Sequence, residues 1–314
     1  MDNKDTNRND YIARINRVMD YIENNLDQNL NLNTLANVAN FSPFHFHRIF
    51  TIFTGETLNI HIQRIRMERA AILLHNDRKI SVSDIAFLCG FNNISSFGRT
   101  FRTYFQVPPK IFRQQERAVL VQNGVRYSKN GTLIRQNTNY KLIPASQLSD
   151  TALEQVIFTD TKVEIKEMPE MHVAYVRHTG HFSQIGKAYE RLMSWAACKG
   201  LLNFPTTKVL TIINDDPTIT PIEKVRQDAC ITVDKDIKLE SEIGRSKLTA
   251  GKYAVGHFEI LEQDFEKAWN TVCLWLIERD YSLCGKCYEI HYNDHKQHPE
   301  KKFIMDICMP IKRI

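Results

Sequence analysis

Long hydrophobic runs are absent from this sequence of 314 residues. A helix that crosses a membrane needs about 20 consecutive, mostly apolar residues, and no segment approaches that length. The first ten residues are polar and charged, and they lack the apolar core of a secretory signal peptide. Cysteine is sparse and its number, seven, is odd, which is typical of reduced thiols rather than of a disulfide framework. We therefore expect a cytoplasmic protein with no membrane association.

A strong net charge is absent too, since the formal value is only +5. Residues 1–117 hold 15 Lys and Arg against 11 Asp and Glu, whereas residues 161–314 hold 22 of each. Twelve of the fifteen N-terminal cations are arginines, which bind phosphate and guanine through paired hydrogen bonds. This bias favours nucleic-acid binding by the N-terminal region, although a solvated helical face would carry similar charges.

Helical periodicity dominates the first 54 residues. Apolar residues at steps of three and four predict a helix over 11–27, and a shorter helix follows over 32–39. Ser42 and Pro43 then form a helix start, with a hydroxyl cap and proline at the first position. The helix that follows runs to residue 54 and stops at glycine. It is expected to bury Phe46, Ile49, Phe50 and Phe53.

The same design returns about fifty residues later, after a connecting helix over 58–75. Ser81 and Asp84 resemble a capping box, and Gly90 with Phe91 forms the next turn. Two short helices joined by such a turn form a helix-turn-helix unit. The sequence therefore predicts two of these units in an all-α domain over residues 1–117. In the second unit the apolar spacing returns at Ile85, Ala86, Leu88 and Cys89, and the following helix is expected to bury Phe97, Phe101, Tyr104 and Phe105.

The side chains opposite this core are candidates for contact with DNA. Arg48 and Arg99 are the best candidates for base edges, because arginine pairs with the O6 and N7 atoms of guanine. His47, Ser95 and Ser96 are expected to contact bases or phosphates. The structural alternative is that these side chains are ordinary solvent-exposed residues with no role in DNA binding. The full set is Phe44, His45, His47, Arg48, Thr51, Ile94, Ser95, Ser96, Arg99 and Arg102.

Residues 35–50 and 85–117 resemble the AraC/XylS family of transcription regulators. The resemblance implies two recognition helices in successive major-groove segments of double-stranded promoter DNA, about 34 Å apart. One chain would then read an asymmetric site, and RNA polymerase is an expected partner. Asn40 stands where glycine is common in the family, and asparagine tolerates a left-handed turn. The signature residues are Gly90, Phe91, Phe97, Arg99, Phe101, Phe105, Pro108, Pro109 and Arg113.

Residues 118–160 lose the helical periodicity and gather Asn, Gly, Ser and Thr. We interpret them as a linker with one or two short strands or a short helix. Residues 161–314 then show strand-like alternation, interrupted by expected helices over 183–198 and 263–279. The expected strands are 163–165, 172–177, 209–213, 229–233, 252–257, 288–292 and 303–311.

A strand-and-helix pattern occurs twice in this C-terminal region. In each copy a strand alanine and a helix tryptophan are 21 residues apart, first Ala174 and Trp195, then Ala254 and Trp275. We predict an α+β domain of two strand-helix-strand-strand modules that share one antiparallel sheet. Both helices are expected on one face of the sheet, with the opposite face free for a ligand.

Residues 161–314 resemble the GyrI-like effector-binding domain, and the whole arrangement is similar to the Rob-like regulators. The resemblance lies in the stretches 173–180, 215–217, 251–254 and 288–290. It implies an apolar, aromatic-lined cleft with a glutamate on a late strand, where Glu289 stands. The implied ligand is a small amphipathic or cationic molecule, and no cofactor is implied. The candidate ligand-binding residues are Glu289, Tyr175, Tyr253, Trp195 and Trp275.

Structural alternatives remain open for these residues. Glu289 would instead be a sheet-edge carboxylate paired with Lys or Arg, and Trp195, Trp269 and Trp275 would be core residues. A zinc site is a weaker alternative, because only one Cys-x-x-Cys pair is present and residues 287–292 already have the pattern of a strand. Its ligands would come from Cys284, Cys287, His291, His295 and His298.

Two functional alternatives also remain for the C-terminal region. Some GyrI-like proteins hydrolyse strained electrophiles with a Glu and a Tyr, so Glu289 could act as a base. The sheet could also dock another protein. Attachment to a DNA-binding domain favours sensing over turnover. We therefore expect a transcription activator that senses a small molecule, rather than an enzyme.

Overall fold

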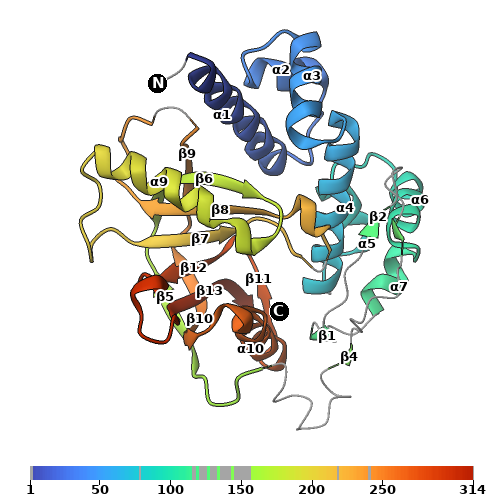
Figure 1. Cartoon of the computed structure of the whole chain (residues 1–314). Helices are drawn as coiled ribbons and strands as arrows, with labels where there is room; N and C mark the ends of the chain where they lie inside the picture. Colours follow the sequence, from blue (N-terminus) through green and yellow to red (C-terminus); the bar gives the residue numbers. More distant parts are fainter. Residues whose placement is uncertain are drawn as a thin grey trace. The chain divides into compact units, whose positions relative to one another are not determined.

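The computed structural model describes residues 3–77, 79–114, 157–217, 219–239 and 242–313, together with two-residue strands at 118–119, 126–127, 133–134 and 143–144. The chain forms two compact units (Figure 1). The first consists mainly of Met1–Gln115, and the second of Gln136–Lys238 and Arg245–Ile314. Among the described residues, no helix is both long and apolar enough to cross a membrane.

The first unit is helical, as predicted. Helix α3 has the predicted bounds and ends at Gly55, whose φ of 68° lies in the left-handed region. Side chains cap other helices: Asn31 accepts the Thr34 N–H, and Ser81 accepts the Asp84 N–H. The helices are α1 (Asn3–Asn24), α2 (Leu32–Val38), α3 (Pro43–Thr54), α4 (Leu58–Asn76), α5 (Val82–Leu88), α6 (Ile94–Phe105) and α7 (Pro109–Gln114), the last of which was not predicted.

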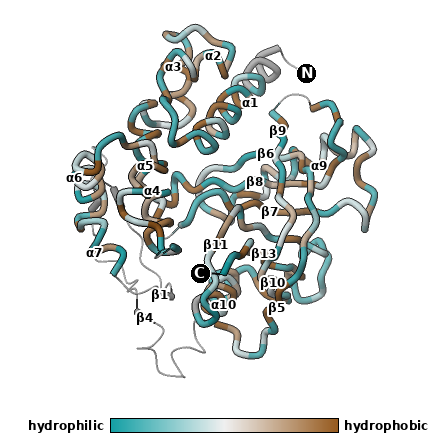
Figure 2. The backbone as a smooth tube through the Cα atoms, turned by 180° about the vertical axis from the view of Figure 1, so that it is seen from behind, coloured by the Kyte–Doolittle hydropathy of each residue, from teal (hydrophilic) through white to brown (hydrophobic). Residues whose placement is uncertain are grey.

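Phenylalanines form much of the core of this unit. Phe46 and Phe50 of α3, and Phe97 and Phe101 of α6, are all fully buried. Figure 2 shows how hydrophilic and hydrophobic residues alternate along α1 and α4. The burial predicted for Phe53 was wrong, because this residue lies in the last turn of α3 and is 37% exposed. Leu88, which repeats the apolar spacing, is 52% exposed because α5 buries its opposite side.

The second unit is built on an antiparallel sheet. Its strands follow the order β5-β10-β13-β12-β7-β8-β6-β9, and β11 pairs with β13. Strands from opposite ends of this order are joined by links of two residues, 169–170 between β5 and β6 and 249–250 between β9 and β10. The sheet must therefore curl strongly. The strands are β5 (Val163–Met168), β6 (Met171–Thr179), β7 (Val209–Ile213), β8 (Arg226–Thr232), β9 (Gly244–Leu248), β10 (Gly251–Ile260), β11 (Tyr281–Leu283), β12 (Cys287–His291) and β13 (Phe303–Arg313).

Both helices of this unit, α9 (Gly186–Cys198) and α10 (Phe265–Glu278), lie on one face of the sheet, as predicted. Thr211 and Glu289 are cross-strand partners on that face. The first contacts Tyr189 of α9 and the second contacts Trp269 of α10.

The opposite face is not free, so this part of the prediction was wrong. The curled sheet encloses it, and three tyrosines there are at most 2% exposed: Tyr175, Tyr253 and Tyr288. Large apolar side chains of neighbouring strands fill the space that a flat sheet would have left open to solvent.

Most of the predicted linker lies outside the described residues. Within it, strand β1 (Ala118–Val119) pairs with β4 (Ile143–Pro144), and β2 (Arg126–Tyr127) pairs with β3 (Leu133–Ile134). The expected boundaries 1–117, 118–160 and 161–314 therefore stay predictions.

Candidate DNA interface and effector site

Helix α3 presents one side to solvent along its length. Phe44 is 75% exposed, and the exposed Arg48 places its guanidinium 5.9 Å from the Phe44 ring centroid. His47 is exposed as well, and the half-buried Thr51 donates its hydroxyl to the His47 carbonyl oxygen. This side offers a guanidinium, an imidazole and an aromatic ring, a combination suited to contact with bases and phosphates.

Two residues modify the predicted surface of α3. His45 is half-buried, because its ring packs 5.7 Å from Tyr11 and 5.1 Å from Phe41 between centroids. Ile52 is 71% exposed, although the sequence did not single it out. His45 thus helps to anchor α3, whereas Ile52 extends its exposed side.

Helix α6 presents a more polar side. Its cap residue Asn93 accepts the backbone N–H groups of Ser95 and Ser96, at 2.7 and 3.3 Å. Arg99 and Arg102 follow on the exposed side, one turn apart. Ile94, at the start of the helix, is 45% exposed. Thr103 is also exposed, although the sequence analysis did not include it among the candidate DNA contacts.

The turns before the two recognition helices differ in how closely they are packed. Asn40 has φ 52° in the first turn, and its carbonyl oxygen accepts a hydrogen bond from Arg14 at 3.0 Å. Gly90 has φ 74° in the second turn. A Cβ atom on Gly90 would lie 2.1 Å from the Leu26 carbonyl oxygen and 2.4 Å from the Arg66 guanidinium. Asparagine therefore suffices in the first turn, whereas the second requires glycine.

In the second unit, Glu289 lies on the central strand β12 and is only 4% exposed. Its Oε1 accepts a hydrogen bond from the Trp269 indole N–H at 2.7 Å, and its Oε2 lies 3.4 Å from His291 Nε2. The carboxylate is thus not at the sheet edge, and no Lys or Arg among the described residues forms an ion pair with it. It is buried beside one neutral donor at hydrogen-bond distance and one imidazole nitrogen farther away.

A directed chain of hydrogen bonds extends this site from Glu289 to α9. The Tyr189 hydroxyl donates to the Leu210 carbonyl at 2.8 Å, and burial raises its pKa well above the ordinary value, so it stays protonated. The Thr211 hydroxyl therefore donates to the Tyr189 oxygen at 2.9 Å. It then accepts the His291 Nε2–H at 2.8 Å. The site therefore has fixed donors, and Glu289 is its strongest acceptor.

Aromatic rings surround the histidine end of this site. The Phe303 ring packs 5.0 Å from Phe265 and 4.0 Å from His295 between centroids. It also lies 6.5 Å from the ring of His291. The environment near the carboxylate is therefore amphipathic, with ring faces beside a buried acceptor.

Comparison with known proteins matches both halves of the chain. Residues 35–115 match the family described as helix-turn-helix domain, and residues 161–312 match the GyrI-like small molecule binding domain. PqrA of Proteus vulgaris, named a probable transcription factor, is 32% identical over 102 residues, which cover 32% of this chain and 83% of PqrA. The Tn10 TetD protein of Escherichia coli is 36% identical over 102 residues, covering 32% of this chain and 73% of TetD. The chain belongs to the AraC family of transcription regulators.

A third relative is the HTH-type transcriptional activator RhaS of Enterobacter sp. (strain 638). It is 35% identical over 109 residues, which cover 34% of this chain and 38% of RhaS. The AraC-family chain is thus a DNA-binding transcription regulator whose C-terminal half is a GyrI-like ligand-binding domain.

The structure does not bring all predicted ligand-binding residues of this AraC-family regulator together. Tyr175 and Tyr253 lie on the enclosed face of the sheet, opposite Glu289. Trp275 stacks on Tyr281 at 5.9 Å instead, and Trp195 is half-buried on α9. Sequence reasoning treated Trp269 as a core residue. It missed Thr211, which strand pairing places opposite Glu289, and Tyr189, which reaches the site through its hydrogen bond to Thr211.

The proposed zinc ligands do not form a cluster. Residues 287–291 form β12, and Cys284 and Cys287 are free thiols. Burial raises the pKa of both thiols above the ordinary value, which disfavours the thiolate that binds metal. No group of three or more His, Cys, Asp or Glu side chains suited to a metal ion occurs among the described residues of this regulator.

Proposed function

We propose that this AraC-family regulator activates transcription from promoters that it binds through α3 and α6. Residues 1–117 would read one asymmetric site, with Arg48 and Arg99 on base edges, and would recruit RNA polymerase. Residues 161–314 would bind a small amphipathic cation at Glu289. The relative RhaS, which is named a transcriptional activator, supports activation rather than repression.

The observation that carries this proposal is the buried Glu289 carboxylate, which faces neutral or weak donors between two helices. Trp269 occupies one oxygen, and the contact of His291 with the other is long. A ligand ammonium group would supply the missing donor and charge, and the rings of Trp269 and Phe303 would cover its apolar part. The ligand would bias the two states of the regulator by binding one of them better.

Arginine substitutions test the DNA contacts. The DNA used is a site selected from random sequences by the wild-type full chain. Arg99→Ala is expected to weaken binding to this site by about 1–3 kcal/mol, roughly five- to 150-fold, because a bidentate base contact is lost. Arg48→Ala should act similarly at the other half of the site. Fluorescence anisotropy against the selected site and single-base variants measures both effects. Lys187→Ala, an exposed charge change on α9, should bind like the wild type.

Substitution of the buried carboxylate tests the effector site. Glu289→Gln keeps the shape and removes the charge, so affinity for naphthylmethylammonium should fall about tenfold or more. Affinity for neutral naphthylmethanol should hardly change. Calorimetry on the full chain measures both ligands.

The exposed Glu190 of α9 provides a matched control, because Glu190→Gln removes the same charge from the same unit. Cation binding that is equally weak in both variants would point to general electrostatics and against a site at Glu289. Cation binding unchanged in Glu289→Gln would reject this carboxylate as the acceptor.

A further inference from the structure

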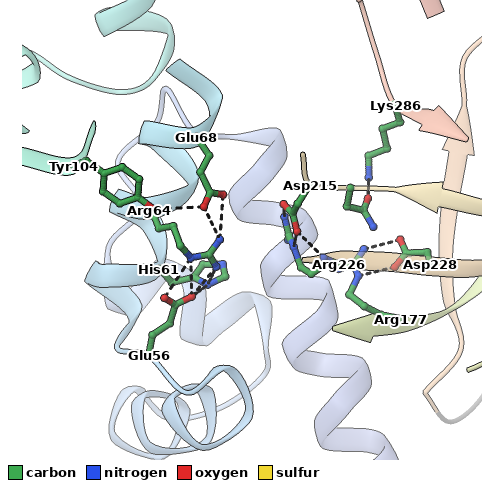
Figure 3. A network of polar contacts seen from close by, with 11 residues as sticks. Glu56, His61, Arg64, Glu68, Tyr104, Arg177, Asp215, Arg226, Asp228 and Lys286 are labelled. Carbon is green, nitrogen blue, oxygen red and sulfur yellow. Dashed lines mark hydrogen bonds and ion pairs between the residues drawn. The ribbon is translucent and has the colours of Figure 1, made fainter. Parts of the chain in front are cut away.

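Helix α4 connects the two helix-turn-helix units and carries a buried network of charged side chains (Figure 3). Arg64 is at its centre: Nη2 donates to Glu56 Oε1 at 2.7 Å, and Nη1 donates to Glu68 Oε2 at 3.1 Å. His61 Nδ1 donates to the same Glu56 oxygen at 2.8 Å. Tyr104 donates its hydroxyl to Glu68 Oε1 at 3.5 Å.

The network reaches both recognition helices. Glu56 directly follows Gly55, the residue that ends α3, and the His61 ring meets Phe50 of α3 edge-on at 5.2 Å. At the other end, Tyr104 belongs to α6. Arg64 therefore joins the end of the first recognition helix to a carboxylate that contacts the second.

The charges of this network are buried. His61 is 1% exposed, Arg64 6% and Glu68 4%. Burial opposes ionisation of Glu56, but hydrogen bonds from His61 and Arg64 outweigh it and lower its pKa to about 2. Glu56 is thus a carboxylate at neutral pH, held by a fixed set of donors.

Buried ion pairs are a weak source of stability, because desolvation offsets most of their attraction, and apolar side chains of similar volume often replace them without loss. Their geometry is far more restrictive than that of apolar packing, because each donor must meet its acceptor at a set distance and angle. A network of this kind is therefore better suited to fixing a geometry than to holding a core together.

We propose that Arg64 is a positioning residue that fixes the separation and rotation of α3 relative to α6. It thereby determines which spacing between the two halves of the DNA site the regulator accepts. The inference rests on the proposed function in one respect, since it takes α3 and α6 as the helices that read DNA. Adding one base pair between the half-sites moves them by about 3.4 Å and about one tenth of a turn, so a rigid pair of helices must discriminate against it.

The test measures spacing tolerance instead of affinity alone. A site selected from random DNA by the wild-type full chain is remade with one base pair added or removed between its halves. The wild type should lose roughly tenfold or more in affinity on each altered site, a loss comparable to that of one mismatched contact. Arg64→Met, which keeps the length and loses the donors, should lose no more than about threefold on the altered sites, because its helices adjust.

Two further variants separate positioning from charge and from folding. Arg69→Met removes an exposed arginine of the same helix, so any loss of affinity should be equal at all spacings. Tyr104→Phe removes only the α6 hydroxyl. It should also reduce the difference in affinity between the selected site and the sites with altered spacing, even where Arg64→Met fails to fold. Wild-type spacing selectivity retained by folded Arg64→Met, or by Tyr104→Phe in its place, would overturn the inference. Sequence-blind binding by the wild type would instead reject the proposed function.

Discussion

Gly90→Ala is expected to destabilise the DNA-binding unit by roughly 2–6 kcal/mol. The left-handed φ of 74° strains any residue with a side chain. The added Cβ would also overlap the Leu26 carbonyl oxygen at 2.1 Å, a backbone atom that cannot move aside alone. Since a whole domain is stable by about 5–15 kcal/mol, this loss is a large share of the stability and should lower the temperature at which specific DNA binding is lost.

Denaturant unfolding measured by two signals tests this expectation. All three tryptophans lie in the second unit, so their fluorescence reports that unit alone. Gly90→Ala should shift the helical circular-dichroism transition to lower denaturant and leave the fluorescence transition in place. Asn40→Gly is the matched control, because Asn40 occupies the equivalent turn with φ 52° and should change stability by only a few tenths of a kcal/mol. A Gly90→Ala chain that unfolds like the wild type would show that the turn relaxes freely.

Arg177→Met is expected to destabilise the second unit by about 3–5 kcal/mol. Arg177 Nε and Nη2 donate to the two oxygens of Asp228 at 2.7 and 2.8 Å (Figure 3). Their side chains are 2% and 0% exposed, so the substitution leaves a carboxylate buried without its guanidinium. Tryptophan fluorescence during denaturant unfolding measures the loss. Arg177→Met combined with Asp228→Leu should recover most of the lost stability, because neither charge of this pair remains. A double variant as unstable as the single one would contradict this origin.

The same pair predicts a pH dependence. Burial opposes ionisation of Asp228, but the Arg177 guanidinium outweighs it and lowers the pKa below the ordinary value. A carboxyl group with a depressed pKa contributes stability above its unfolded pKa of about 3.9, and this stability is lost as the pH falls through the folded pKa. The wild type should therefore lose stability below about pH 4. The difference in free energy of unfolding between the wild type and Arg177→Met should become smaller in this pH range, because protonation neutralises the buried, unpaired Asp228 carboxylate of the variant.

The helix-turn-helix units were predictable because their signals are local. Caps at Ser81 and the prolines and glycines near helix ends act within a few residues, and phenylalanines at helical spacing mark the core. The buried charge network of α4 was not predicted, because its burial is not signalled by any local pattern. His61, Arg64 and Glu68 recur at helical spacing, and a polar stripe of this kind usually faces water. Only the packing of other helices against it reveals that it is buried.

The proposed effector site was predictable only in part. The resemblance singled out Glu289 as a candidate, and alternation placed His291 on the same face of its strand. Its partner Trp269 lies twenty residues earlier on α10, and the polar chain continues to Thr211 through cross-strand pairing. Neither pairing register nor sheet curl is encoded in a local pattern, which is why Tyr175 and Tyr253 were placed in a cleft that the curled sheet encloses.

The most direct test of the central claim is selection of binding sites from random DNA by the full chain, followed by anisotropy at two salt concentrations. A regulator that reads DNA with two recognition helices should select one asymmetric site covering two major-groove segments about 10 base pairs apart. It should keep a preference of roughly a thousandfold or more over unrelated DNA at physiological salt. Binding that is weak, equal for all sequences and lost steeply with salt would show contact with phosphates alone and would contradict the account.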